Sequence, residues 1–173
     1  SIKKILTLSK KNKIKYLYTS KYYGNANKLL GKEDLRKFEI IVKFKVKDFF
    51  ENNIVTELYK NKKEIKKNIS ILMIDGFEKL DYMKAKKIYN ILKILKKRKI
   101  INNFGYSIYS FKNIKKVCKM FKPGVIQCSY NIFDRRLEKN NLLKFFKRNG
   151  IYVDVRSVFL QGLLINKFSK IPK

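Results

Sequence analysis

The sequence predicts a parallel β/α barrel fold, and three features of the chain support that prediction. Six short runs rich in Ile, Val, Phe and Tyr recur along the 173 residues, with starts 24, 31, 34, 22 and 27 residues apart. This spacing leaves room for a helix between neighbouring strands, and the intervening segments show helical periodicity. Strands this apolar favour a parallel sheet covered by helices. The predicted strands are Ile14–Ser20, Phe38–Phe44, Ile69–Asp75, Asn103–Tyr109, Val125–Asn131 and Tyr152–Val158.

Three of the intervening segments give clear helix signals. Asp81 is a typical N-cap residue, and the segment to Lys99 that follows it has an apolar stripe with lysines on its other face. A second apolar repeat starts at Phe111 and ends before Pro123-Gly124, and a third helix is predicted to follow Asp134 and stop at Gly150. The stripe of the first helix consists of Tyr82, Ala85, Ile88, Tyr89, Leu92 and Leu95.

A parallel sheet can close into a barrel or stay open and doubly wound. An open sheet that binds nucleotide favours a G-x-G-x-x-G turn after its first strand, and Gly24 and Gly31 are too far apart for that role. The barrel is therefore favoured. In such barrels the polar residues at the carboxyl ends of strands are the ones to examine for function.

Composition limits the class of protein. The longest apolar stretches, Ile69 to Ile74 and Val158 to Ile165, are shorter than the ~20 residues of a membrane helix, and no export signal opens the chain. The chain has no histidine, and Cys118 and Cys128 are its only cysteines, so we expect no metal site and no disulfide framework. Reduced thiols fit a cytoplasmic location.

The net charge of +30 would by itself suggest a nucleic-acid or anionic-membrane partner. However, only 6 of the 43 basic residues are Arg, and the lysines are spread over all predicted helices. No glycine-aromatic pattern that stacks bases is present. We therefore expect a solvated lysine surface and no nucleic-acid partner, and we keep a non-catalytic scaffold that binds RNA or another polyanion as the alternative function.

The predicted strand ends bring together Tyr23 and Lys43, which could act as an acid-base unit. The pKa of a tyrosine is near 10, and a neighbouring ammonium group would lower it toward neutrality. In a chain with 11 tyrosines and many lysines, chance proximity of such a pair is the competing interpretation.

Beyond this pair, several stretches together resemble the aldo-keto reductase family. Tyr18-Thr19-Ser20, Tyr23-Gly24, Leu30-Gly31 and a strand ending in Lys43 are similar to the start of the family pattern. Later matches follow in the family's order over nearly the whole chain. They are Gly105 to Ser110, Val125 to Arg136 and Val155 to Leu164.

The resemblance implies an incomplete (β/α)8 barrel, a single domain over residues 1–173 that lacks the first and eighth strands, and hence a fragment. It implies reduction of a small carbonyl or sugar-type substrate with NADPH or NADH. Tyr23 would protonate the carbonyl oxygen, and Lys43 would lower the pKa of Tyr23. Ser107 and Gln127 would contact the nicotinamide carboxamide, and Arg156 and Ser157 would lie where the family packs the nicotinamide ring. The adenine-phosphate contacts would lie largely around the missing eighth strand.

The chain departs from the family pattern at two catalytic positions. The aspartate that hydrogen-bonds the lysine is replaced by Tyr18, and the histidine that orients the substrate carbonyl is replaced by Ile74. We therefore expect activity to be weakened or lost. Asp154 and Arg156 share one strand face, where they could form a structural ion pair or reshape the site. The open edges of an incomplete barrel also predict self-association.

Overall fold

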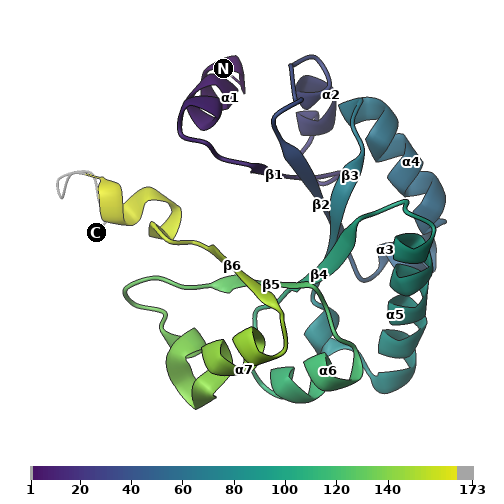
Figure 1. Cartoon of the computed structure of the whole chain (residues 1–173), viewed down its shortest axis with the longest axis vertical. Coiled ribbons are helices and arrows are strands. Elements are labelled where there is room, and N and C mark those ends of the chain that lie inside the picture. The colour runs from purple at the N-terminus through teal and green to yellow at the C-terminus, as the bar shows by residue number, and fades with distance from the viewer. Residues whose placement is uncertain (1, 167–173) are drawn as a thin grey trace.

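A computed structural model describes residues 2–166, which form six parallel strands in sequential order with helices between them. Figure 1 shows the sheet curled into part of a barrel, with most helices on its convex side. This confirms an incomplete barrel of the (β/α)8 type. The strands are β1 (Tyr16–Ser20), β2 (Glu39–Lys45), β3 (Ile69–Asp75), β4 (Asn103–Ser107), β5 (Val125–Ser129) and β6 (Tyr152–Arg156).

The helices follow the predicted alternation, with several short additions. Asp81 caps α5 by accepting a hydrogen bond from the Lys84 backbone N–H at 2.9 Å, and Gly150 takes a left-handed φ of +62° just beyond α7. The bounds are α1 (Ile2–Lys11), α2 (Ala26–Leu30), α3 (Asp48–Glu51), α4 (Ile54–Ile65), α5 (Tyr82–Lys97), α6 (Ile114–Met120) and α7 (Leu142–Arg148), with 3-10 helices η1 (Phe77–Lys79), η2 (Arg136–Asn141) and η3 (Leu160–Ile165).

Some boundaries differ from the prediction. β1 begins two residues later than expected, and β4, β5 and β6 each end two residues earlier, where the chain turns into loops. The helix expected directly after Asp134 starts as the 3-10 helix η2 and becomes α-helical only at Leu142.

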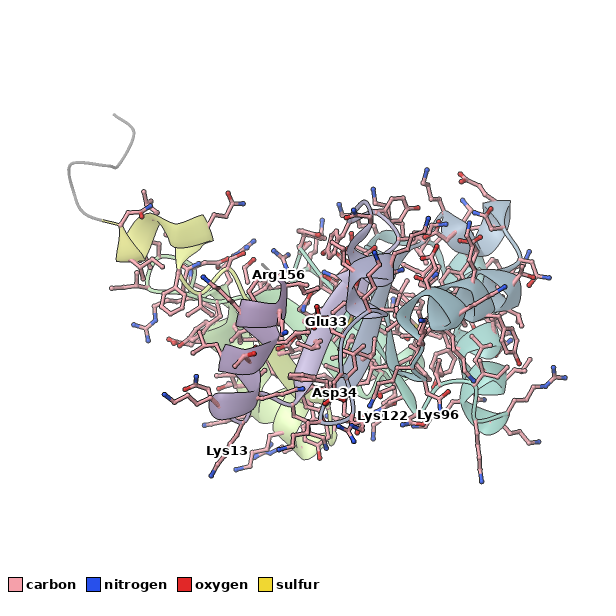
Figure 2. The ribbon with its side chains drawn as sticks, turned by 90° about the horizontal axis from the view of Figure 1, so that it is seen from above. Lys13, Glu33, Asp34, Lys96, Lys122 and Arg156 are labelled. Carbon is pink, nitrogen blue, oxygen red and sulfur yellow. The ribbon has the colours of Figure 1, made fainter. Side chains whose placement is uncertain are left out.

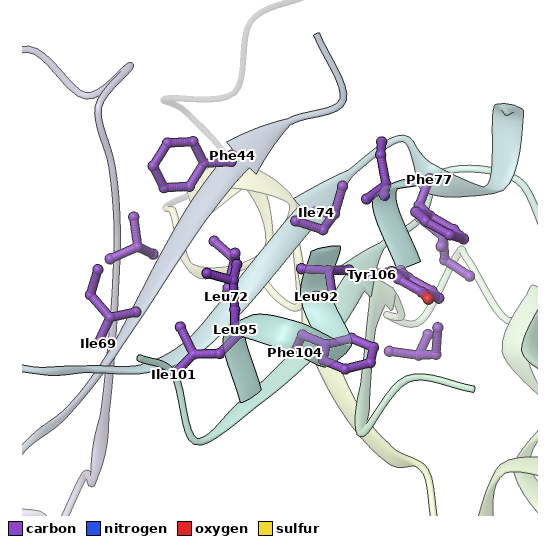
Figure 3. Packing of buried hydrophobic residues seen from close by; sticks show 14 of the residues in the cluster. Phe44, Ile69, Leu72, Ile74, Phe77, Leu92, Leu95, Ile101, Phe104 and Tyr106 are labelled. Carbon is purple, nitrogen blue, oxygen red and sulfur yellow. The ribbon is translucent and has the colours of Figure 1, made fainter. Parts of the chain in front are cut away.

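The two faces of the sheet bury different sets of side chains because successive residues of a strand point to opposite sides. The outer face packs against the helices and forms the main core, part of which is shown in Figure 3. The inner face holds a smaller apolar cluster below the carboxyl ends of the strands. Outer-face residues include Ile40, Val42, Phe44, Leu72 and Ile74, and the inner cluster consists of Ile41, Met73 and Val125 with Tyr18 and Ile71 beside it.

Strand register brings polar inner-face residues to one level. Asp75 pairs with Ser107, Ser107 with Gln127, and Gln127 with Asp154. In Figure 2, Lys13 and Lys122, which precede β1 and β5, lie along one rim, while Arg156, at the end of β6, lies toward the other. The carboxyl ends of the strands thus gather at one mouth of the half-barrel.

Strands β1 and β6 are the two edges of this sheet, and neither pairs with a further strand within residues 2–166. Tyr152, at the start of β6, is 76% exposed. No helix in this part of the chain combines the length and the apolar character that crossing a membrane requires.

Candidate active site

Lys43 lies at the centre of a polar cluster on the inner face. It occupies the end of β2, where the strand continues the inner row that starts with the apolar Ile41. Its Nζ donates hydrogen bonds to Gln127 Oε1 at 2.8 Å and to Ser107 Oγ at 3.2 Å. Ser107 on β4 and Gln127 on β5 therefore hold the ammonium group across the mouth of the half-barrel, although β3 lies between them and β2.

The electrostatic surroundings of Lys43 act in both directions. Burial lowers the pKa of its ammonium group, and the positive charge of Arg156 lowers it further. The carboxylates of Asp75 and Asp154 oppose this by raising the pKa. Lys43 thus has an overall lowered pKa, as desolvation of a half-buried cation produces.

A second part of the cluster joins the two edge strands. Tyr18, on β1, donates its hydroxyl to Asp154 Oδ2 on β6, and Gln127 Nε2 donates to the same oxygen at 2.8 Å. Burial raises the pKa of Tyr18, and the contact with Asp154 raises it further. The hydroxyl of Tyr18 is therefore held in its neutral, proton-donating form.

Beside this cluster, Asp75, Tyr109 and Arg156 form a polar group with unused hydrogen-bonding atoms. The Arg156 guanidinium lies 4.3 Å from the centre of the Tyr109 ring and donates from Nη2 to the Ile108 carbonyl at 3.2 Å. Arg156 Nε and Asp75 Oδ1 are buried without a hydrogen-bond partner among the described residues. A buried donor and a buried acceptor of this kind could bind a polar group of a ligand.

An apolar cavity of ≈ 300 Å³ lies at the amino-terminal side of the inner face. Its lining includes Tyr16, Ile41 and Tyr152, and Tyr18 and Asp154 also line it. Most of its lining is apolar, unlike that of the polar mouth, and Tyr18 and Asp154 border both. Residues 2–166 contain no cluster of His, Cys, Asp and Glu side chains that could hold a metal ion.

Comparison with known proteins identifies the family. The sequence model described as the aldo/keto reductase family matches residues 2–173. This chain belongs to the aldo/keto reductase family. A search of curated proteins finds no match.

Solved aldo-keto reductases share the fold. The enzyme AKR11C1 from Bacillus halodurans, in its apo form, superposes with a TM-score of 0.74 at 22% identity, covering 93% of this chain and 56% of that one. The glycerol dehydrogenase AKR11B4 from Gluconobacter oxydans superposes with a TM-score of 0.74 at 17% identity, covering 97% and 57%. The chain therefore spans less than two thirds of the length of these structures.

The two catalytic residues that the aldo-keto reductase resemblance implies differ in burial: Lys43 is half-buried and Tyr23 is exposed. Tyr23 lies in the turn after β1, where its backbone N–H bonds the Ser20 carbonyl at 3.0 Å and its side chain is 53% exposed. No hydrogen bond joins Tyr23 to Lys43 in the part of the chain that the structure describes. The neighbouring Tyr22 instead donates to Asp48 Oδ1 at 2.6 Å.

The side chain of Ile74 lies on the outer, helix-facing side of the sheet. Its side chain is 0% exposed and belongs to the core between the sheet and the helices, near Leu72 and Leu92 in Figure 3. No side chain at position 74 can reach the mouth without reversing the strand, because alternate residues face opposite sides. The inner-facing residue at the end of β3 is Asp75, which pairs with Ser107.

The structure also describes contacts of the cofactor residues that the resemblance implies, which are Ser107, Gln127, Arg156 and Ser157. Ser107 and Gln127 reach the mouth as expected, but their hydrogen bonds go to Lys43. Asp154 and Arg156 share the inner face, but no ion pair joins them among residues 2–166. Asp154 accepts from Tyr18 and Gln127, and Arg156 donates to the Ile108 carbonyl. Ser157 lies just beyond β6 with a φ of +58°, and its carbonyl accepts a bond from Asn131 Nδ2 at 3.1 Å.

Tyr109 and Asp75 are the site residues that sequence reasoning missed. The run from Ile71 to Ile74 is apolar throughout, so its pattern does not reveal which residues face inward. The register with β4 does reveal it, because Asp75 is paired with Ser107.

Proposed function

We propose that the chain is an oxidoreductase of the aldo-keto reductase type that reduces a small carbonyl or sugar-type substrate with NADPH or NADH. The observation that carries this proposal is Lys43, held at the mouth by Ser107 and Gln127 with a lowered pKa. Its activity is weakened or lost because a tyrosine occupies position 18 and a histidine is absent from the mouth. The buried, uncrosslinked Cys118 and Cys128 suit a cytoplasmic location.

In this proposal the proton comes from Tyr23. Tyr23 lies in the turn that follows the carboxyl end of β1, and the Lys43 ammonium would stabilise the phenolate left after proton transfer to the carbonyl oxygen. The nicotinamide cofactor supplies the hydride. Asp75 replaces the usual histidine as the polar side chain nearest to the substrate carbonyl, and its carboxylate does not donate the orienting hydrogen bond.

The described residues suit the nicotinamide end of such a cofactor. A carboxamide has one acceptor oxygen, which could accept a hydrogen bond from the unpartnered Arg156 Nε. Ser107 Oγ can also donate to a carboxamide while it accepts from Lys43. Arg156 and Ser157 remain the candidates for residues beside the ring.

Titration with NADPH, followed by cofactor fluorescence, tests the proposal. We expect saturable binding that is weakened by Ser107→Ala and unchanged by Lys28→Met, a substitution on the surface of α2. Any carbonyl reduction that the protein retains should fall to background in Tyr23→Phe. Absence of NADPH and NADH binding by the folded protein would refute the cofactor assignment.

We also expect self-association of the 173-residue chain through its open edges. Unpaired backbone groups along β1 and β6 favour pairing with another strand. Sedimentation velocity should show dimers or larger species whose fraction rises with protein concentration. A monomer at all concentrations would contradict this expectation.

A further inference from the structure

The Lys43 ammonium has neutral direct partners. Ser107 and Gln127 are uncharged, and no carboxylate of the described residues lies within ion-pair distance of Lys43 Nζ. A half-buried cation is costly unless negative charge offsets its desolvation. Three charged groups act on it from the neighbouring strands: Asp75 on β3, and Asp154 and Arg156 on β6. Tyr18, on β1, contacts Asp154.

Gln127 connects Lys43 to one of these carboxylates. An ammonium group only donates hydrogen bonds and a carboxylate only accepts them, so the amide oxygen must face Lys43 and the amide nitrogen must face Asp154. The two bonds are both 2.8 Å long. Glutamine is suited to this place because one side chain supplies both an acceptor and a donor.

Asp154 is itself fixed by a second donor. The Tyr18 hydroxyl reaches the same Oδ2 from the opposite edge strand. The Tyr18 hydroxyl and the Gln127 amide thus converge on one oxygen of Asp154 and fix the position of its carboxylate. The charge of Asp75 also raises the pKa of Lys43, and by more than the charge of Asp154 does, but only Asp154 is connected to Lys43 through hydrogen bonds of Gln127.

We infer that Asp154 is a positioning residue that supplies the counter-charge of Lys43 through the amide of Gln127, with Tyr18 holding its carboxylate in place. Negative charge on Asp154 polarises the amide, and the amide oxygen then binds the ammonium more strongly. Tyr18 therefore acts on Lys43 indirectly, because it holds the Asp154 carboxylate on β6 in place. This inference deepens the proposed function, since Lys43 is the residue on which that proposal rests.

Direct titration of Lys43 tests the inference without requiring turnover. Protein labelled with ¹³C at lysine Cε is titrated by NMR, and the Lys43 signal is assigned by its loss in Lys43→Arg. In Asp154→Asn, which is isosteric and keeps an oxygen to accept from Tyr18, we expect Lys43 to titrate at lower pH than in the wild type. Asp154→Glu should restore most of the difference, and an unchanged Lys43 titration in Asp154→Asn would overturn the inference.

A double-mutant cycle separates the amide connection from a simple effect of charge through space. We expect the effect of Asp154→Asn to be smaller in a Gln127→Leu background than in the wild-type background. An equal effect in both backgrounds would refute the role of the amide. Because neither measurement uses cofactor or substrate, failure here is distinguishable from failure of the NADPH titration.

Discussion

Ile74→His is expected to destabilise the protein strongly, whereas Asp75→His, one residue along, is expected to leave stability close to that of the wild type. Position 74 is fully buried in the helix-facing core, so the substitution removes an apolar side chain and buries an imidazole without a partner. We expect the free energy of unfolding to fall by about 3–5 kcal/mol, as the sum of lost apolar burial and an unsatisfied polar group. Urea denaturation followed by circular dichroism measures the difference.

Asp75→His, the more stable of these two variants, should also be the more active one. An imidazole at position 75 lies at the mouth beside Lys43 and can donate a hydrogen bond to a substrate carbonyl. One such donor is worth about a hundredfold in rate in other enzymes, so we expect Asp75→His to raise carbonyl reduction by about that factor. Equal stability of the two variants would contradict the assignment of faces, and unchanged activity in a folded Asp75→His protein would count against Asp75 as the residue nearest to the carbonyl.

This pair marks the limit of what the sequence could predict about β3. Ile71, Leu72, Met73 and Ile74 are all apolar because both faces of the strand are buried, the outer against helices and the inner in the half-barrel. Alternation therefore gives no signal there. On β2, in contrast, a charged residue follows three apolar ones, so the pattern itself singles out Lys43.

The sequence of strands and helices was predictable for a related reason. Each strand is a short apolar run and α5 has a clear stripe behind its N-cap, so both signals are local. The bond between Tyr18 and Asp154 is not local, since it joins residues 136 apart and depends on how strongly the sheet curls. Likewise, local pattern could not show that Tyr23 is exposed while Tyr22 bonds Asp48.

Gly31→Ala is the second substitution for which we expect a large loss of stability. A Cβ at Gly31, which ends α2, would lie 2.0 Å from the Glu64 carbonyl oxygen on α4. Both groups belong to backbone, so the two helices must separate by more than a side chain can absorb. Their separation would also disturb the buried hydrogen bonds from Thr19 to Asn27 and from Asn27 to Asn61, each 2.7 Å long.

We expect Gly31→Ala to lower the free energy of unfolding by about 3–5 kcal/mol, from overpacking together with a disturbed buried polar contact. The φ of Gly31 is −66°, which any residue adopts, so backbone strain would contribute nothing to the loss. Gly150→Ala is the matched control, because Gly150 has a φ of +62° and open space around its Cβ position, and its loss of about 1–2 kcal/mol would come from backbone strain alone. If chemical denaturation shows Gly31→Ala to be no less stable than Gly150→Ala, the close packing of α2 on α4 is not a determinant of stability.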